Sequence, residues 1–349
     1  MSKKTKKLLN FALIFGTLAI VLFIGFQGQD FESAMRALQD ISIWAVIMCL
    51  IAYFGYVFFD ALGLFYFIRR NGYKTSLRYS LFVSIAGMYY SNVTPGATGG
   101  QPMQVFYMKK AGIPIGIGTS AITVRLFCFQ FMLEVISTVL WATHAEFIAQ
   151  QVGSNMWILV CGYIYNTIVV LLISMMALSR RLVSAVVNLF IKVGAKLRIC
   201  KDPDASRTRW AEVVELFHSS IKMLRHRPVD LLIQLGIAAA QLLSQMLVIY
   251  ILYRDFDLTG ASYLQITTLA VLLYVSAAYT PLPGASGAQE GVFALFFSGL
   301  FPDSIRFVAL LLWRFFTYYV GLIIGAIVTV YRGISPHKFK DVPAEDGAA

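Results

Sequence analysis

Charged residues are scarce in this chain: Asp, Glu, Lys and Arg make up only 13% of its 349 residues. Soluble domains carry about a quarter. Together with a hydrophobic fraction of 58%, this scarcity excludes an ordinary soluble domain. It indicates a protein that crosses a membrane several times.

Cysteine and histidine are also few, with four of each. No cysteine falls in a segment expected outside the cell, so we predict no disulfide bonds. The histidines show no metal-ligand spacing. A P-loop, a nucleophile elbow and a paired acidic motif are lacking too. The longest stretch outside the membrane, 179–228, is too short for a typical catalytic domain, and we expect no catalytic residue, metal or cofactor.

Apolar runs long enough to cross about 30 Å of hydrocarbon recur along the chain. We predict six full spans, at residues 8–26, 41–68, 114–142, 156–178, 229–253 and 304–330. Two further apolar regions, 79–108 and 262–300, contain Pro-Gly breaks and are interpreted as pairs of half-helices. The predicted fold is all-α and polytopic, with residues 1–349 in a single integral membrane domain. The first span resembles a signal peptide, but it is long and lacks a small-residue cleavage site, so we interpret it as uncleaved.

The net charge of +11 comes from an uneven distribution of basic residues. Most of the 29 Lys and Arg lie in the two tails, in the 179–228 segment and in short turns on the same side. This bias follows the positive-inside rule and places both termini in the cytoplasm. We therefore expect a multi-pass protein of the bacterial cytoplasmic membrane. Its basic side would meet anionic lipid headgroups, and no nucleic-acid partner is expected.

Two short segments of the chain echo each other. Pro95-Gly96-Ala97 and Pro283-Gly284-Ala285 are each followed by a small hydroxyl residue, a Gly and a Gln. The charge bias indicates that the first segment re-enters from the cytoplasm and the second from outside. We therefore predict an inverted-topology repeat, 41–142 and 229–330, separated by the basic cytoplasmic segment 179–228. Chance similarity is the alternative, because Gly and Pro are frequent in membrane helices.

A break in a helix at membrane depth is costly unless its backbone is buried in protein or faces a wet cavity. The N-terminus of a half-helix presents N–H groups and a partial positive charge, which suit a phosphate. Tight helix packing through small residues is the alternative interpretation. The candidate residues of the two breaks are Pro95, Gly96, Gly99, Gly100, Gln101, Pro283, Gly284, Gly287 and Gln289.

One arginine follows each break at a similar distance, so that Arg125 and Arg314 both lie near the predicted midplane. We predict that they bind a lipid phosphate, because a guanidinium forms forked bonds with phosphate oxygens. Alternatively, each is a structural tie to carbonyls or to a carboxylate such as Glu290. Glu290 is itself a candidate counter-charge or proton site. Glu134 is expected to face another element or the outer interface, and Asp60 to be a solvated or paired group near the cytoplasmic surface.

The two Pro-Gly-Ala segments, taken together with Arg125 and Arg314, resemble the lysylphosphatidylglycerol synthase transmembrane family over nearly the whole chain. This family is the flippase-like membrane domain of the bacterial multiple peptide resistance factor, and stand-alone forms of it exist. The resemblance implies a lipid translocase fold with re-entrant helices. In two-domain members it implies movement of aminoacylated phosphatidylglycerol to the outer leaflet, which repels cationic peptides. The soluble aminoacyl-transferase domain of those members has no counterpart in this sequence.

Three functions are compatible with these patterns. The first is a flippase-like transporter that moves an anionic or aminoacylated phospholipid, with Arg125, Arg314 and Glu290 at its site. The second is a phosphatidylglycerol lysyltransferase, another lipid-modifying enzyme or its membrane subunit, linked to resistance to cationic peptides. The third is a membrane scaffold. A membrane phospholipid is the expected partner, and a separate transferase protein and a homodimer are left open.

Overall fold

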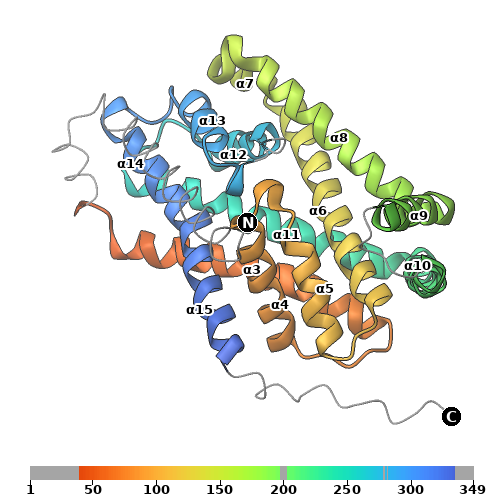
Figure 1. The fold of residues 1–349 in the computed structure, drawn as a ribbon. Helices are drawn as coiled ribbons and strands as arrows, with labels where there is room; N and C mark the ends of the chain where they lie inside the picture. Colours follow the sequence, from red (N-terminus) through yellow and green to blue (C-terminus); the bar gives the residue numbers. More distant parts are fainter. Residues whose placement is uncertain (1–38, 197–202, 278–279, 281, 335–349) are drawn as a thin grey trace.

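The computed structural model describes residues 39–196, 203–277, 280 and 282–334. Within these ranges the regular structure is helical, without a strand (Figure 1). The protein is therefore an all-α polytopic membrane protein, as predicted. The predicted first span, 8–26, and both chain termini lie outside the described residues.

Five helical segments among the described residues are long and apolar enough to cross a membrane. They confirm five of the six predicted spans. The helices are α3 (Ile43–Arg70), α6 (Ile115–Thr143), α8 (Met156–Leu178), α11 (Pro228–Asp255) and the consecutive pair α14 (Asp303–Arg314) and α15 (Val320–Ile334). At about 1.5 Å per residue, a helix as long as α3 exceeds the hydrocarbon thickness, so it must tilt or extend beyond it.

The two Pro-Gly regions form helical hairpins, as predicted. Each consists of a helix, a short 3-10 turn at the Pro-Gly-Ala segment and a second helix, and the two hairpins approach each other from opposite sides of the molecule (Figure 1). The first hairpin is α4 (Leu77–Asn92), η1 (Pro95–Ala97) and α5 (Gly100–Lys110), and the second is α12 (Tyr263–Ala277), η3 (Pro283–Ala285) and α13 (Ala288–Phe296).

The two breaks share the same unusual backbone conformation. Gly96 has φ 59° and ψ 24°, and Gly284 has φ 61° and ψ 19°. The alanine that follows each glycine also has a positive φ, 54° at Ala97 and 50° at Ala285. A positive φ is uncommon for a residue with a Cβ atom. Its occurrence at both positions shows that the sequence echo is a structural repeat.

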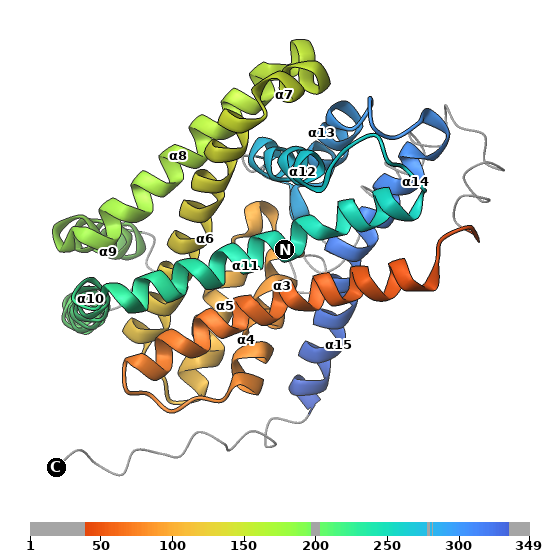
Figure 2. The same cartoon turned by 180° about the vertical axis from the view of Figure 1, so that it is seen from behind.

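The first long helices of the two repeats, α3 and α11, lie side by side and antiparallel (Figure 2). At one end, the Asp255 carboxylate accepts hydrogen bonds from the backbone N–H and the side chain of Ser42. At the other end, Arg70 and Asp230 form an ion pair at 3.0 Å. Opposite directions of equivalent helices are what an inverted repeat requires.

Among the described residues, α8 and three further helices lie between the two repeats. Helices α9 (Arg180–Lys196) and α10 (Pro203–Arg225) occupy the segment where the sequence suggested two amphipathic helices, and Figures 1 and 2 show them nearly end-on while α8 runs across the view. Helix α7 (Ala145–Val152) was not predicted, because its eight residues are too few to produce a clear periodic pattern. It contacts α13 and lies at the N-terminal end of α8, away from α9.

An aromatic stack joins the second hairpin to α14. Phe293 of α13 stacks on Phe297 with ring centroids 4.8 Å apart and on Trp313 of α14 at 5.3 Å. All three side chains are buried. Contacts between aromatic rings add to the stabilisation that burial provides. This packing fixes the end of α14 beside the second break, where the next residue is Arg314.

Candidate functional site

Both breaks line one cavity of about 520 Å³ in the middle of the described structure. The turns η1 and η3 contact each other, so the two hairpin tips meet there. Arg125 and Arg314 both line the cavity, as do four of the predicted break residues: Gly96, Gln101, Gly284 and Gln289. Its volume is within the usual range of small-molecule sites.

The second break is tied to Arg314 by several contacts. The guanidinium donates to Gln289 Oε1 at 2.5 Å, to the carbonyl oxygen of Gly284 at 3.1 Å and to Ser286 Oγ at 3.3 Å. Its Nε lies 2.7 Å from Glu290 Oε1. The exposed fractions of the two charged side chains are 4% for Arg314 and 9% for Glu290. These are the contacts expected of the structural tie, with Glu290 as the counter-charge.

Glu290 also caps the half-helix that follows the break. Its Oε2 accepts a hydrogen bond of 2.7 Å from the backbone N–H of Gly287, the residue before α13. A carboxylate in this place satisfies a free N–H group and opposes the partial positive charge of the helix N-terminus. The N-terminus of α13 therefore already holds an anionic group, supplied by the chain itself.

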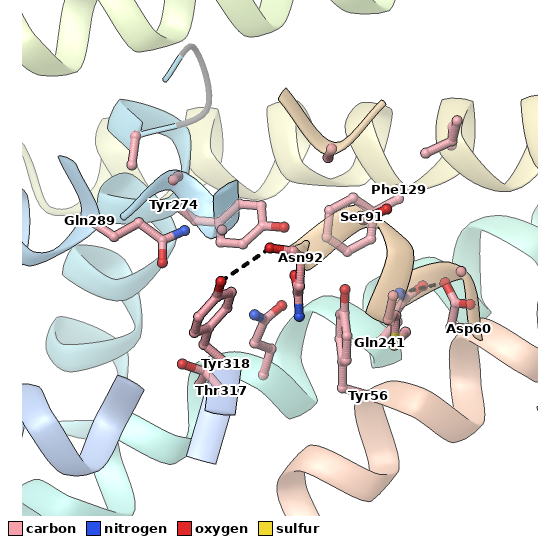
Figure 3. A pocket seen from close by; sticks show the side chains of 18 of the residues that line it. Tyr56, Asp60, Ser91, Asn92, Phe129, Gln241, Tyr274, Gln289, Thr317 and Tyr318 are labelled. Atoms are coloured by element: carbon pink, nitrogen blue, oxygen red, sulfur yellow. Dashed lines mark hydrogen bonds between the residues drawn. The ribbon is translucent and has the colours of Figure 1, made fainter. Parts of the chain in front are cut away.

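A short π-helix, η4 (Phe315–Tyr319), begins directly after Arg314. Its widened turn places the Tyr318 ring 4.6 Å from the guanidinium carbon of Arg314. The Tyr318 hydroxyl donates to the carbonyl oxygen of Asn92 at 3.1 Å (Figure 3). Because Asn92 ends α4, this bond links the second repeat to the first. Single π turns are frequent at functional sites.

Arg125 in the first repeat has a different set of partners. It forms an ion pair with Asp60 of α3 and donates to Gln104 Oε1 of α5 at 3.1 Å. The exposed fractions of the Arg125 and Asp60 side chains are 12% and 6%. Gln241 of α11 donates to the second oxygen of Asp60 at 3.1 Å (Figure 3). One carboxylate thus joins helices of both repeats at the cavity wall.

Asp60 is paired, one of the two predicted alternatives, but it is not solvated, because it is buried at the cavity wall beside Arg125. Glu134 faces another element, as expected. It accepts hydrogen bonds from Asn166 and Thr167 of α8.

The two hairpin tips differ in exposure and in attachment. Residues 95–98 at the first tip are all exposed, and among the described residues no hydrogen bond joins them to Arg125. At the second tip, Pro283 and Ser286 are buried. In the structure, Arg314 therefore holds the tip of its own repeat, whereas Arg125 does not hold the tip of the first repeat.

Several predicted break residues have a packing role beside the cavity. Gly100 faces α4 so closely that a Cβ atom there would lie 1.9 Å from Ser91 Oγ. Gly99 donates its backbone N–H to Thr94 Oγ1 at 2.9 Å. Pro95, Pro283 and Gly287 shape the turns and are not among the residues that line the cavity. Tight packing and a cavity thus occur together, and the two interpretations of the breaks are compatible.

Sequence reasoning missed the polar residues that other helices contribute to the cavity. They carry amide or phenol groups, and they include Tyr56, Gln104, Gln130, Gln241, Gln245 and Tyr274. Polar side chains within predicted spans were the available signal, since such residues usually face the protein interior. No group of three or more His, Cys, Asp or Glu side chains that could hold a metal occurs in the described part of the chain.

Comparison with known proteins identifies the family. The profile described as "Lysylphosphatidylglycerol synthase TM region" matches residues 8–325. A UPF0104 membrane protein of Archaeoglobus fulgidus is 24% identical over 277 residues, which cover 77% of this chain and 81% of the relative. A UPF0104 membrane protein of Methanocaldococcus jannaschii is 22% identical over 288 residues, which cover 79% and 81%. The chain belongs to the lysylphosphatidylglycerol synthase transmembrane region family.

Proposed function

We propose that this protein is a flippase-like transporter that moves an anionic or aminoacylated phospholipid between the leaflets of its membrane. The observation that carries the proposal is the meeting of the two breaks, from oppositely directed repeats, at one polar cavity. Irregular backbone at the interface of inverted repeats is where secondary transporters bind their substrates. In this proposal the headgroup enters the cavity and the acyl chains stay in the bilayer.

Arg125 is the arginine that meets the lipid phosphate in the conformation described. Its side-chain partners among the described residues are Asp60 and Gln104. Arg314, by contrast, is held by the carbonyl and side chains of its own hairpin. A phosphate can therefore engage Arg125 at a lower cost in broken contacts.

The difference between the repeats supports alternating access. In the conformation described, Arg314 is hydrogen-bonded to the second tip, while Arg125 makes no hydrogen bond to the first tip. Inverted repeats alternate by exchanging their conformations. The opposite state would then have Arg125 holding the first tip near Gly96, with Arg314 released toward the phosphate. Glu290 and Asp60 serve in turn as the counter-charge of the arginine that is not bound to cargo.

The alternative of a lysyltransferase or a subunit of one has less support. The family description contains the word synthase, but the described residues form a membrane domain with a headgroup-sized cavity rather than a site for transfer from a charged tRNA. The relatives found are archaeal. Cytoplasmic termini and the bacterial membrane remain predictions, and so do a partner transferase and a homodimer.

The proposal is tested by lipid exchange in liposomes. Purified protein is reconstituted with fluorescent phosphatidylglycerol or its lysyl form, and leaflet exchange is followed by dithionite quenching. The paired variant Arg125→Gln/Asp60→Asn removes both charges, so it leaves no unpaired buried ion. Arg306→Gln is the matched control, because it breaks an ion pair with Asp303 that lies outside the cavity.

We expect exchange by the wild type and by Arg306→Gln, and its loss in the paired variant. Each protein is first shown to be folded by its elution profile and its thermal unfolding. Absence of exchange of both lipids by folded wild-type protein would contradict transport of phosphatidylglycerol-type cargo. Exchange that survives in the paired variant would exclude Arg125 as the phosphate contact.

A further inference from the structure

The charged groups at the cavity are balanced against each other. Arg125 is paired with Asp60 and Arg314 with Glu290, so these four side chains carry no net charge. If a headgroup carries a second charge in addition to its phosphate, none of these four side chains is available as an unpaired partner for that charge. Glu290 does not line the cavity, and both oxygens of Asp60 already accept hydrogen bonds, from Arg125 and from Gln241, so the wall offers a lysyl ammonium group no free carboxylate oxygen among the described residues.

The rest of the polar lining consists of uncharged side chains: amides, phenols and the hydroxyls of Ser91, Thr280 and Thr317. Within the described part of the chain, the cavity is lined by six glutamines, Gln101, Gln104, Gln130, Gln241, Gln245 and Gln289. Amide and phenol groups can both donate and accept hydrogen bonds. An uncharged hydroxyl group has the same double capacity, whereas an ionised phosphate oxygen accepts and an ammonium group donates. The lining is therefore matched to hydroxyl groups.

Several of these groups have hydrogen-bonding capacity that the protein does not use. The hydroxyls of Tyr56 and Tyr274 make no hydrogen bond to another described residue, and Figure 3 shows the two side chains on either side of Asn92. Gln245 Oε1 is buried without a partner. Buried polar groups are nearly always satisfied, so a partner from outside the chain is expected for Gln245 Oε1, while the two phenols offer free donors and acceptors at the cavity wall.

We infer that the cavity selects lipids by the hydroxyl groups of an uncharged polyol or sugar headgroup, which are bound by Tyr56, Tyr274 and Gln245. This inference rests on the proposed transport function and specifies its cargo. The phosphate, where the lipid has one, meets Arg125, and the polyol lies against the two phenols. A headgroup of a few linked carbons fits within about 520 Å³, and the cargo needs no amine.

The decisive cargo comparison holds the charge constant. Fluorescent phosphatidylglycerol and phosphatidylpropanol carry the same phosphate, and only the first has free hydroxyls. A fluorescent glucosyl diacylglycerol supplies hydroxyls without a phosphate, and lysyl-phosphatidylglycerol supplies an added ammonium group. Exchange is measured for each lipid with the wild type, with Tyr56→Phe/Tyr274→Phe and with Gln245→Leu. Tyr250→Phe is the matched control, because Tyr250 packs on Tyr263 and does not line the cavity.

We expect the wild type and Tyr250→Phe to exchange phosphatidylglycerol and the glucosyl lipid about 10-fold faster than phosphatidylpropanol, the ratio that roughly one net hydrogen bond provides. In the phenylalanine pair and in Gln245→Leu, this ratio should fall toward one, because exchange of the two hydroxyl-bearing lipids slows more than exchange of phosphatidylpropanol. Equal exchange of all four lipids by the wild type would overturn the inference and leave the transport function standing. No exchange of any lipid by folded protein would overturn both.

Free polyols separate a lipid headgroup from a water-soluble ligand. Glycerol, inositol and glucose are added at millimolar concentration to the exchange assay and to thermal unfolding of the purified protein. If the protein binds the polyol only as part of a lipid, the free polyols should have little or no effect on lipid exchange or on the unfolding temperature. The preference among lipid headgroups should remain clear. A free polyol that raises the unfolding temperature of the wild type but not of Tyr56→Phe/Tyr274→Phe, without any lipid exchange, would replace the lipid cargo by a soluble one.

Discussion

Single residues at this site combine a structural task with a place at the cavity. Glu290 caps α13 through the N–H of Gly287 and pairs with Arg314, while Arg314 holds the carbonyl of Gly284. A buried ion pair contributes little net stability in itself, but removing one partner leaves an uncompensated buried charge. The stability of the second break therefore depends on both members being present.

This dependence predicts a non-additive pair of substitutions. Glu290→Gln keeps the shape of the side chain and leaves Arg314 unpaired, which should lower the free energy of unfolding by about 3–5 kcal/mol. The double variant Arg314→Met/Glu290→Gln should recover a large part of that loss and still fail to exchange lipid. Thermal unfolding in detergent and the liposome assay measure the two effects. Additive losses of stability would show that the two residues act independently.

Much of the residue-level site could be predicted from the sequence, and one part could not. The pattern of Pro, Gly and Gln located both breaks, and the position of the arginines placed both near them. The partner of Arg125 was missed, because Asp60 lies 65 residues earlier on another helix. Which side chains meet across helices depends on tilt and rotation, which packing sets rather than local sequence. The π-helix after Arg314 likewise has no sequence signal.

At the scale of elements, each hairpin requires its two half-helices to pack closely. In the first hairpin, Gly100 of α5 lies against α4, where a Cβ atom would be 1.9 Å from Ser91 Oγ and 2.7 Å from the carbonyl oxygen of Gly87. Backbone on one side leaves no room to relax. Small residues allow such close approach between membrane helices. The glycine at position 100 therefore determines how closely α5 packs against α4.

We predict that Gly100→Ala destabilises the protein by about 1–3 kcal/mol through overpacking and slows lipid exchange. Gly236→Ala in α11 is the matched control, because nothing lies within 4 Å of its added Cβ atom. Alanine favours a helix over glycine by up to about 1 kcal/mol, so the control should be neutral or slightly stabilised. The measurement compares the unfolding temperatures of the two variants with that of the wild type. An unchanged unfolding temperature for Gly100→Ala would mean that α4 and α5 can separate without cost.

At the scale of the whole molecule, the inverted repeat was predictable, because charge bias and the echo of two motifs are both visible in the sequence. The α3–α11 contact and the unequal state of the two tips were not predictable, since symmetric sequence features do not indicate which repeat holds its tip. The structure shows the tips in contact with each other. Transport by exchange of the two conformations requires this contact to rearrange.

A reversible cross-link between the tips tests that requirement. Cysteines at Ala97 and Ala285, both of which line the cavity, are introduced after the exposed Cys161 is replaced by serine. A short reducible cross-linking reagent should stop lipid exchange, and reduction should restore it. The single variants Ala97→Cys and Ala285→Cys, treated identically, should retain exchange. Undiminished exchange in the cross-linked protein would rule out relative movement of the two breaks.

The pairing of both arginines with carboxylates also governs how the protein responds to the membrane potential. Moving one elementary charge through 100 mV changes its energy by about 2.3 kcal/mol. Arg125 with Asp60 and Arg314 with Glu290 are electrically neutral pairs, so their rearrangement shifts little net charge through the field. The voltage sensitivity of transport therefore belongs to the cargo. An anionic phospholipid would be driven toward the positive side, and a neutral glycolipid would cross at a rate independent of voltage.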